Sequence, residues 1–301
     1  MQTFTMQTFH DRTAVITGAA SGIGRGVAER AAQEGMRVVL ADIEPSPLAG
    51  VERALRATGA RALAVPTDVA DASAVEALAA RAEAAFGPVH LLVNCAGVAA
   101  GGRAWEAPPD DWDWVLGVNL KGVVHGLRSF VPRMLAAASA PGYAGHVVNV
   151  ASAASVLPFH PSAPYQVSKA GVLALTENLA FGLRYAGAPI GVTALCPGWV
   201  DTRILDAERN RPGGPAARAP LSPESAARAA QIDGYLRARV AAGARPADVA
   251  ARVFAAVAAG ALYAFTDREM ADVLHERAEA LRAARDAAPA VHAAAAAERA
   301  A

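Results

Sequence analysis

The chain has 301 residues, and its 28 Lys and Arg balance 28 Asp and Glu, so neither a nucleic-acid-binding arm nor a surface for anionic membranes is expected. Two cysteines, Cys95 and Cys196, are too few for a disulfide scaffold, and neither stands at zinc-ligand spacing from another Cys or His. We therefore expect no metal site, and a reducing cytoplasmic compartment.

Short apolar runs alternate with longer segments of helical period through the first two thirds of the chain. The runs do not alternate apolar and polar residues, which is typical of strands buried on both faces. The sequence predicts strands at 13–17, 37–41, 62–66, 90–94, 146–150 and 190–195, with a last strand at 261–265. It predicts helices at 22–34, 47–58, 72–86, 110–138, 164–185, 223–242, 246–259 and 268–286.

Repeated alternation of strand and helix predicts an α/β fold: one doubly wound parallel sheet of the Rossmann type, with helices on both faces. Such a sheet binds its ligand beyond the carboxyl ends of its strands. No linker interrupts the pattern, so we expect a single domain over residues 10–287. Within it, residues 198–245 are expected to form a mobile substrate loop and its helices.

The stretch from 134 to 168 contains no Asp, Glu, Lys or Arg and could be mistaken for a membrane span. Its prolines and glycines exclude a continuous helix across a bilayer, so we expect buried core there. The N-terminus repeats Met-Gln-Thr-Phe from Met1 and from Met6, which leaves the translation start open between the two. Residues 1–9 and 288–301 are expected to be frayed tails.

A glycine-rich turn, Thr17-Gly-Ala-Ala-Ser-Gly-Ile-Gly24, joins the first predicted strand to the first predicted helix. Its glycines permit a tight turn and let the backbone approach a pyrophosphate, whose charge then meets the helix N-terminus. An ordinary strand-to-helix turn is the alternative. The position between a strand and a helix favours a dinucleotide site. Its expected residues are Thr17, Gly18, Ser21, Gly22, Ile23 and Gly24.

The second predicted strand ends in Asp42, followed by Ile43. An acidic side chain there can accept hydrogen bonds from both hydroxyls of an adenosine ribose and repels a 2′-phosphate. Its alternative role is to cap the next helix, which Ser46 could also do. Since no arginine follows directly, the sequence favours NAD over NADP. Asp68 and Val69 are expected at the adenine edge, with helix capping as the alternative for Asp68.

Tyr165 and Lys169 stand four residues apart at the start of a predicted helix, so both project from one face. A tyrosine hydroxyl has a pKa near 10, and lowering that pKa to about 7.5 requires roughly 3.4 kcal/mol. One ammonium at about 4 Å supplies about 4 kcal/mol at an effective dielectric constant of 20. Lysine occurs in this chain only as Lys121 and Lys169, which makes its position beside Tyr165 a specific clue. A surface Tyr–Lys pair is the alternative.

Two further polar residues fit a site around Tyr165. Ser152 follows the fifth predicted strand and can hold a substrate oxygen while Tyr165 moves the proton, although a serine there is usually a turn former. Asn119 sits within a predicted helix, where asparagine is a poor helix former. Its amide suggests another role, such as holding a water beside Lys169.

Together these motifs resemble those of the short-chain dehydrogenases/reductases over residues 10–205. The family's glycine motif is similar to Thr17–Gly24, and its Asn-Asn-Ala-Gly motif to Asn94-Cys-Ala-Gly97, where the cysteine puts one supporting hydrogen bond in doubt. Its Pro-Gly motif is similar to Pro197-Gly198 with Thr202. Its catalytic tetrad is matched by Asn119, Ser152, Tyr165 and Lys169.

The resemblance implies that Tyr165 is the general acid/base and that Lys169 lowers its pKa and binds the nicotinamide ribose. It implies that Ser152 orients the substrate oxygen and that Asn119 anchors a relay water. It also implies cofactor contacts by Asn94, Ala96, Gly97, Pro197, Gly198, Val200 and Thr202. Family members are commonly tetramers built through the helices around 110–138 and 164–185, so a homo-oligomer, tetramer or dimer, is expected.

The segments starting at Asp111 and Phe130 are similar to bacterial dehydrogenases of aryl or other bulky secondary alcohols, including lignin-dimer Cα-dehydrogenases. The expected pocket carries little charge, which suits a hydrophobic alcohol or ketone. Arg203 and Arg209 leave open the alternative of a phosphorylated or carrier-bound substrate. Residues 197–220 are a candidate lid. The expected pocket residues are Val98, Leu157, Phe159, Trp199, Ile204, Leu205 and Tyr235, with His160 as a further candidate.

The leading hypothesis is an oxidoreductase that transfers a hydride between NAD(H) and a hydrophobic secondary alcohol or ketone. One alternative is an NADPH-dependent ketoacyl-type reductase. Another is a dinucleotide-sensing protein without turnover. Ser152, Tyr165 and Lys169 argue against the sensor, because a sensor needs no proton chemistry. The sequence leaves the natural substrate, its stereochemistry and the physiological direction open.

Overall fold

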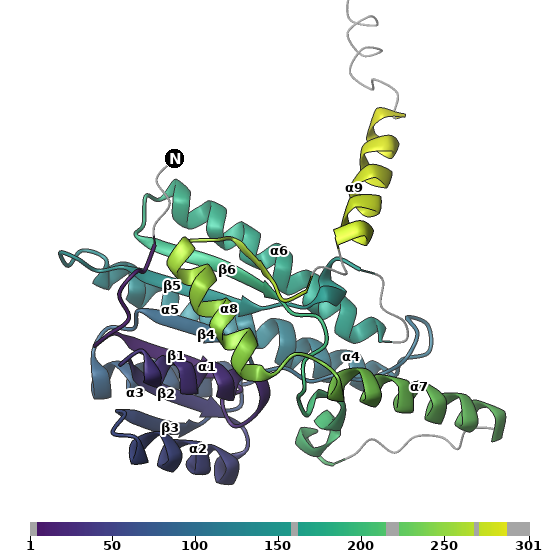
Figure 1. The fold of residues 1–301 in the computed structure, drawn as a ribbon, viewed down its shortest axis with the longest axis horizontal. Coiled ribbons are helices and arrows are strands. Elements are labelled where there is room, and N and C mark those ends of the chain that lie inside the picture. Colours follow the sequence, from purple (N-terminus) through teal and green to yellow (C-terminus); the bar gives the residue numbers. More distant parts are fainter. Residues whose placement is uncertain (1–4, 158–161, 215–222, 268–270, 288–301) are drawn as a thin grey trace, which may run out of the picture. The chain divides into compact units, whose positions relative to one another are not determined.

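The computed structural model describes residues 5–157, 162–214, 223–267 and 271–287. Its central feature is a parallel sheet of seven strands in the order β3-β2-β1-β4-β5-β6-β7 (Figure 1). The strand order reverses between β1 and β4, and in open α/β sheets this switch point is where ligands bind. The strands are β1 (Thr13–Thr17), β2 (Arg37–Asp42), β3 (Ala62–Pro66), β4 (Leu91–Asn94), β5 (Gly145–Val150), β6 (Ile190–Cys196) and β7 (Tyr263–Phe265).

Helices cover both faces of the sheet, as the sequence predicts. The helices described before Asp267 are α1 (Gly22–Gln33), α2 (Pro45–Ala57), α3 (Ala72–Phe86), α4 (Pro109–Leu116), α5 (Gly122–Ala137), α6 (Ala163–Tyr185), α7 (Pro223–Ala241) and α8 (Pro246–Ala259). Helices α1, α2 and α8 pack against strand residues such as Ile16 and Leu40. Helices α3, α5 and α6 pack against the strand residues that face the other side of the sheet, such as Val15 and Val39. Successive strand residues face opposite sides, so each strand contributes to two cores.

The predicted doubly wound sheet is confirmed, and β1 to β6 agree with their predicted ranges to within one residue at each end. The single helix predicted at 110–138 is wrong. It is divided into α4, a π turn η1 (Gly117–Lys121) and α5. Asn119 lies in the π turn and directs its amide to the main chain of Val98, and the wider turn accommodates this inward position.

The chain divides into two compact units, Met1–Thr266 and Asp267–Ala301. The described part of the second unit contains α9 (Ala271–Asp286), on which Leu281 is 63% exposed. A single domain over 10–287 stays a prediction. Fraying over 1–9 is wrong for the described end of that range, because Met6 is buried and Phe9 packs edge-on against Phe254.

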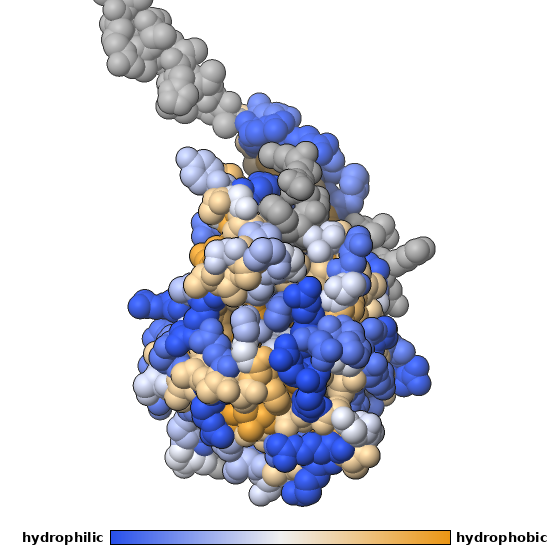
Figure 2. Space-filling model, turned by 90° about the vertical axis from the view of Figure 1, so that its left-hand side faces the viewer, coloured by the Kyte–Doolittle hydropathy of each residue, from blue (hydrophilic) through white to orange (hydrophobic). Residues whose placement is uncertain are grey.

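No helix among the described residues has both the length and the apolar character that crossing a bilayer requires. The uncharged stretch from 134 to 168 instead contributes β5, whose residues are all buried, and the start of α6. Figure 2 shows the face at the left-hand side of Figure 1, where hydrophilic side chains surround a smaller apolar area.

Two histidines are buried among the described residues of the first unit. The Nε2 atom of His146 on β5 lies 2.8 Å from Thr193 Oγ1, while its Nδ1 atom is buried without a hydrogen-bond partner among the described residues. Burial lowers the pKa of His146 to about 3, and burial together with Arg12 lowers the pKa of His90 to about 4. Below pH 6.5 the unfolded chain therefore binds protons that the folded chain excludes, so stability falls as the pH falls through this range.

We expect the His146→Leu variant to lose part of the acid sensitivity of the protein. A histidine with a pKa of 6.5 in the unfolded chain and about 3 in the folded chain loses about 2 kcal/mol of the free energy of unfolding when the pH falls from 7 to 5. Urea denaturation at both pH values measures the difference. An equal slope in the variant and the wild type would contradict the burial argument.

Candidate active site

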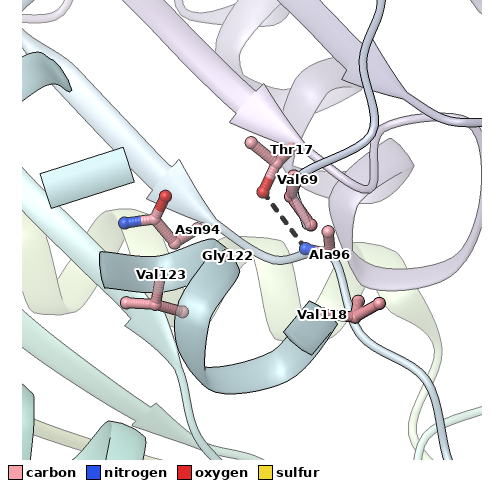
Figure 3. A pocket seen from close by; sticks show the side chains of 7 residues that line it. All are labelled: Thr17, Val69, Asn94, Ala96, Val118, Gly122 and Val123. Carbon is pink, nitrogen blue, oxygen red and sulfur yellow. Dashed lines mark hydrogen bonds between the residues drawn. The ribbon is translucent and has the colours of Figure 1, made fainter. Parts of the chain in front are cut away.

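The predicted site residues meet at the carboxyl edge of the sheet, around the switch point between β1 and β4. Figure 3 shows a hollow at this point, with the ends of β1 and β4 on one side and the π turn and the start of α5 on the other. Thr17 Oγ1 accepts hydrogen bonds from the main-chain nitrogens of Cys95 at 3.0 Å and Ala96 at 3.1 Å, which joins the two strand ends. The hollow is lined by Thr17, Val69, Asn94, Ala96, Val118, Gly122 and Val123.

The glycine-rich turn after β1 has the backbone of an anion cradle. Gly18 and Gly22 have φ values of +69° and +53°, which favour glycine. A Cβ on Gly24 would stand 2.2 Å from the carbonyl oxygen of Gly18. Ser21 precedes α1 as its N-cap residue, but its side chain accepts no capping hydrogen bond within the described chain. The Ser21 side chain therefore does not occupy the main-chain N–H groups of the first turn of α1.

Asp42, at the end of β2, is held by this turn. Its Oδ2 accepts a hydrogen bond of 2.9 Å from the nitrogen of Ala20, and its Oδ1 accepts one of 3.0 Å from the nitrogen of Glu44. Burial raises the pKa of Asp42, and these two hydrogen bonds oppose the rise. The neighbouring Ile43 side chain is 42% exposed. The carboxylate is thus fixed beside the glycine-rich turn.

Helix capping, the alternative role of Asp68, is wrong. Asp71 is the N-cap of α3 and accepts a hydrogen bond of 2.8 Å from the nitrogen of Ser73, whereas Asp68 accepts one of 2.9 Å from the nitrogen of Ala70. The next residue, Val69, is buried against α5.

Two residues of α5 position Val69, and the sequence analysis did not select them. His125 Nδ1 lies 2.9 Å from the carbonyl oxygen of Val69. A Cβ on Gly122 would approach the Val69 side chain to 2.8 Å. Only a glycine at 122 lets α5 approach Val69 this closely.

Asn94 lines the hollow and also forms hydrogen bonds within the sheet. Its Nδ2 donates to Asn149 Oδ1 at 2.8 Å, and Asn149 Nδ2 donates to Thr176 Oγ1 at 3.1 Å. These buried hydrogen bonds join β4, β5 and α6. The main-chain nitrogen of Cys95 donates to Thr17 Oγ1, and this hydrogen bond does not depend on the side chain at position 95.

Ser152, Tyr165 and Lys169 come together from the end of β5 and the start of α6. Ser152 lies close enough to Tyr165 to influence the pKa of its hydroxyl, and Ser152 Oγ accepts a hydrogen bond of 3.1 Å from the nitrogen of Ala154. The ammonium nitrogen of Lys169 lies 5.8 Å from the centroid of the Tyr165 ring and donates to the carbonyl oxygen of Val150 at 2.7 Å. The spacing of four residues therefore places both side chains of α6 in one cluster.

Burial is the largest influence on the pKa values of this cluster. It raises the pKa of Tyr165, and the hydrogen bond with Ser152 opposes the rise. It also lowers the pKa of Lys169 to about 8. The sequence-based arithmetic considered the ammonium alone and expected the pKa of Tyr165 to fall. The structure differs because the ammonium is directed at Val150 and the phenolate would be poorly solvated.

Asn119 fastens the π turn to its surroundings. Its Oδ1 accepts a hydrogen bond of 2.8 Å from the nitrogen of Val98, and its Nδ2 donates to Val98 O at 2.9 Å and to Ser168 Oγ at 3.0 Å. Ser168 Oγ in turn donates to the carbonyl oxygen of Tyr165 at 2.7 Å. A Cβ on Gly97 would stand 3.5 Å from both Asn119 Oδ1 and Lys169 Nζ. The side chain thus lies near Lys169, but its described hydrogen bonds hold the loop after β4.

The segment after β6 closes the site from the far side. The main-chain nitrogen of Gly198 donates to Thr266 Oγ1 at 2.9 Å, and Val200 pairs with Ala244 in an isolated bridge. Pro197 accepts a hydrogen bond of 2.8 Å from the nitrogen of Ala153 through its carbonyl oxygen. A Cβ on Gly22 would lie 3.0 Å from the Thr202 methyl group, so the two sides of the expected cofactor site meet here.

The segment 204–210, η3, forms ion pairs with distant parts of the chain, and the mobility of residues 198–245 stays a prediction. Arg209 pairs with Glu44 at 2.9 Å, and the buried Arg211 pairs with the buried Asp111. The Arg211 guanidinium also lies 4.3 Å from the Trp114 ring centroid. Sequence analysis missed these pairs because no local pattern relates residues so far apart in the chain.

The expected apolar pocket is only partly described. Val98 is buried in a cluster with Trp114, Val115 and Ala207, whereas Tyr235 is 61% exposed on α7. Leu157, Trp199, Ile204 and Leu205 are half-buried. Phe159, His160 and residues 215–220 of the candidate lid lie outside the described residues. No group of three or more His, Cys, Asp or Glu with metal-binding geometry occurs within the described ranges.

Comparisons with known proteins agree with this geometry. The sequence pattern of the family described as short chain dehydrogenase matches residues 12–213. A crystal structure of a short-chain dehydrogenase/reductase from Burkholderia phymatum in complex with NAD has a TM-score of 0.86 at 42% identity, covering 92% of this chain and 96% of that one. An actinorhodin polyketide ketoreductase with NADPH has a TM-score of 0.69 at 30% identity, covering 87% and 97%.

A curated relative, a C alpha-dehydrogenase from Sphingobium sp. (strain NBRC 103272 / SYK-6), is 37% identical over 208 residues. The alignment covers 69% of this chain and 66% of that protein. The similarity to a Cα-dehydrogenase that the motifs suggest is therefore confirmed.

We expect Gly24→Ala to weaken dinucleotide binding at least about tenfold, because the new methyl group would collide with the backbone of Gly18 and deform the cradle. Titration of reduced dinucleotide by fluorescence measures the affinity. Gly50→Ala on α2 is the matched control, because its new Cβ would meet nothing nearer than Arg53 Nη2 at 3.9 Å. The control should bind normally and gain up to about 1 kcal/mol of stability. Equal affinities in both variants would contradict the proposal that the glycine-rich turn binds the dinucleotide.

Proposed function

The chain belongs to the short-chain dehydrogenases, and from that premise we propose that it transfers a hydride between NAD(H) and a hydrophobic secondary alcohol or its ketone, with Tyr165 as the general acid/base. The coarser activity follows from the family: an NAD(P)-dependent oxidoreductase acting on CH–OH groups. The observation that carries the finer proposal is the cluster of Ser152, Tyr165 and Lys169 at the carboxyl edge of the sheet.

Ser152 and Tyr165 together serve the substrate oxygen. Ser152 Oγ accepts the hydrogen bond from the nitrogen of Ala154, which leaves the hydroxyl proton of Ser152 to be donated to Tyr165 or to a substrate oxygen. Because burial raises the pKa of Tyr165, its hydroxyl holds a proton at neutral pH and can give it to a carbonyl oxygen during reduction. In alcohol oxidation the phenolate form of Tyr165 would accept the proton, and the ammonium of Lys169 and the positive charge of a bound oxidised nicotinamide would favour that form.

A bound oxidised nicotinamide supplies the hydride acceptor and a positive charge beside the reacting oxygen. The chain's own contribution is Lys169, whose ammonium lies 5.8 Å from the Tyr165 ring and favours the phenolate electrostatically. With a pKa of about 8, this ammonium is mostly protonated at pH 7 and gives up a proton more readily than a surface lysine. Asn119 positions the pair through Ser168 and the main chain of Tyr165.

The residues around the cradle fit a dinucleotide. Gly24 leaves no room for a side chain, the first turn of α1 presents N–H groups for a pyrophosphate, and Asp42 can accept ribose hydroxyls. The carboxylate of Asp42 supports NAD over NADP, because it repels a 2′-phosphate. The Burkholderia phymatum structure holds NAD, which is in line with this preference.

A hydrophobic substrate is supported by the half-buried apolar residues of the described pocket wall, Trp199, Ile204 and Leu205. The similarity to a C alpha-dehydrogenase points to a bulky secondary alcohol. The second candidate is an NADPH-dependent ketoacyl-type reductase, which the similarity to a polyketide ketoreductase favours. The two differ in the dinucleotide bound and in the substrate turned over.

Assembly and location are also part of the proposal. The exposed apolar residues Val167, Phe181 and Tyr185 of α6 support a homo-oligomer, tetramer or dimer. The two free cysteines support the cytoplasm as the compartment.

We expect the protein to oxidise at least one aryl, terpenoid or steroid secondary alcohol with NAD. The absorbance of the reduced nicotinamide measures this turnover. Tyr165→Phe should reduce turnover at least about a hundredfold, because it removes the proton donor and acceptor, while dinucleotide binding persists. Tyr263→Phe is the matched control, since Tyr263 on β7 also donates its hydroxyl, to Glu177 at 2.8 Å, but outside the cluster. Full activity of Tyr165→Phe, or tight dinucleotide binding with no turnover of any alcohol, would refute the proposal.

We expect Asp42→Ala to raise the affinity for NADP(H) relative to NAD(H) at least about tenfold, because a carboxylate no longer faces the 2′-phosphate. Asp42→Asn removes the charge and keeps an oxygen for the nitrogen of Ala20, so it separates charge from geometry. Asp248→Asn on α8 is the control. If neither variant at position 42 changes the ratio of the two affinities, the ribose role of Asp42 is wrong.

A further inference from the structure

An arginine from the segment after β6 reaches the adenosine end of the proposed dinucleotide site. Arg209, on η3, contacts both carboxylate oxygens of Glu44, with its Nη2 at 2.9 Å from Oε2 and its Nε at 3.2 Å from each oxygen. The two side chains are only 24% and 18% exposed. Partial burial and two-atom contact distinguish this pair from ordinary surface ion pairs.

Glu44 stands two residues after Asp42, and its main-chain nitrogen donates to Asp42 Oδ1 at 3.0 Å. Glu44 and Arg209 act on the same carboxylate with opposite signs: Glu44 raises the pKa of Asp42, and Arg209 lowers it. The Glu44 carboxylate and the Arg209 guanidinium are therefore near enough to Asp42 to act on its charge. The sequence favours NAD because no arginine directly follows Asp42, but the fold brings Arg209 to Glu44, which lies 165 positions earlier in the chain.

The backbone of η3 holds the guanidinium in place. Arg209 Nη1 donates to the carbonyl oxygens of Asp206 at 2.9 Å and Arg203 at 3.2 Å. Two residues further on, Arg211 pairs with Asp111 on α4 and stacks over Trp114. The arginine is thus delivered by an anchored segment.

We infer that Glu44 is a second determinant of dinucleotide choice, which acts by binding Arg209 and withholding it from a 2′-phosphate. A phosphate dianion attracts a guanidinium strongly, and a carboxylate that already holds the guanidinium in a two-atom contact competes with it. With Glu44 in place, Asp42 and Glu44 together exclude the phosphate. Without Glu44, the chain has its own phosphate-binding arginine at the site. The inference rests on the proposed function, because it takes Asp42 as the residue beside the ribose.

The test is a cycle of variants, with affinities for NADH and NADPH measured by fluorescence titration in the absence of substrate. Glu44→Gln should shift the affinity ratio toward NADPH at least about tenfold, because a negative charge is lost and Arg209 is released. Arg209→Gln should shift the ratio the other way, since two carboxylates then lack their cation. Glu44→Gln with Arg209→Gln should lose most of the gain of the single Glu44 variant.

Hydrogen exchange of residues 204–210 provides a readout independent of the dinucleotide. Both single variants should exchange faster there, because each breaks the contact between η3 and the β2–α2 connection. Glu76→Gln is the matched control, because Glu76 also pairs with an arginine of another helix, Arg133 at 2.7 Å, away from the site. It should change neither the ratio nor the exchange of residues 204–210.

An unchanged ratio in Glu44→Gln, or a gain that survives in the double variant, would overturn the inference. This failure is distinguishable from failure of the proposed function. If the Asp42 variants shift the ratio and the Glu44 variants do not, the NAD preference stands and Glu44 has no part in it. If the Asp42 variants have no effect either, the ribose assignment itself is wrong.

Discussion

The buried ammonium of Lys169 is the constraint on which the rest of the site depends. Only 4% of this residue is exposed, and its Nζ donates to the carbonyl oxygen of Val150 at 2.7 Å. Removing a cation from water costs several kcal/mol unless hydrogen bonds and nearby dipoles compensate. The lowered pKa of Lys169 shows that compensation is incomplete. Burial thus disfavours the charged form of Lys169, and a lysine of this kind is typical of functional sites.

Buried polar side chains keep the pieces around this ammonium in register. Ser155 Oγ donates to the carbonyl oxygen of Lys169 at 2.9 Å and accepts from the nitrogen of Ser152, so the turn after β5 is tied to α6. Asn119 ties the loop after β4 to the same helix through Ser168. Each side chain satisfies a main-chain group that would otherwise be buried without a partner, so replacing one leaves another unsatisfied. Packing alone would not specify these positions so narrowly.

Sequence reasoning succeeded where the cause is local. The strand ranges follow from compact apolar runs, and the meeting of Tyr165 with Lys169 follows from the period of one helix. It failed where distant segments decide the outcome. The π turn at Asn119 depends on the main chain of Val98, and the neighbours of Glu44 depend on the path of the chain after β6. The pKa of Tyr165 depends on burial by the whole fold, which the spacing of charges does not reveal.

The buried pair of Arg211 and Asp111 has a consequence for the segment after β6. Their side chains are 6% and 1% exposed, and the guanidinium also lies over Trp114. Lifting this segment from α4 would separate two buried opposite charges, which makes the separated state costly. The same movement would also have to break the pair of Arg209 with Glu44, so the two ion pairs favour the closed position of the segment together.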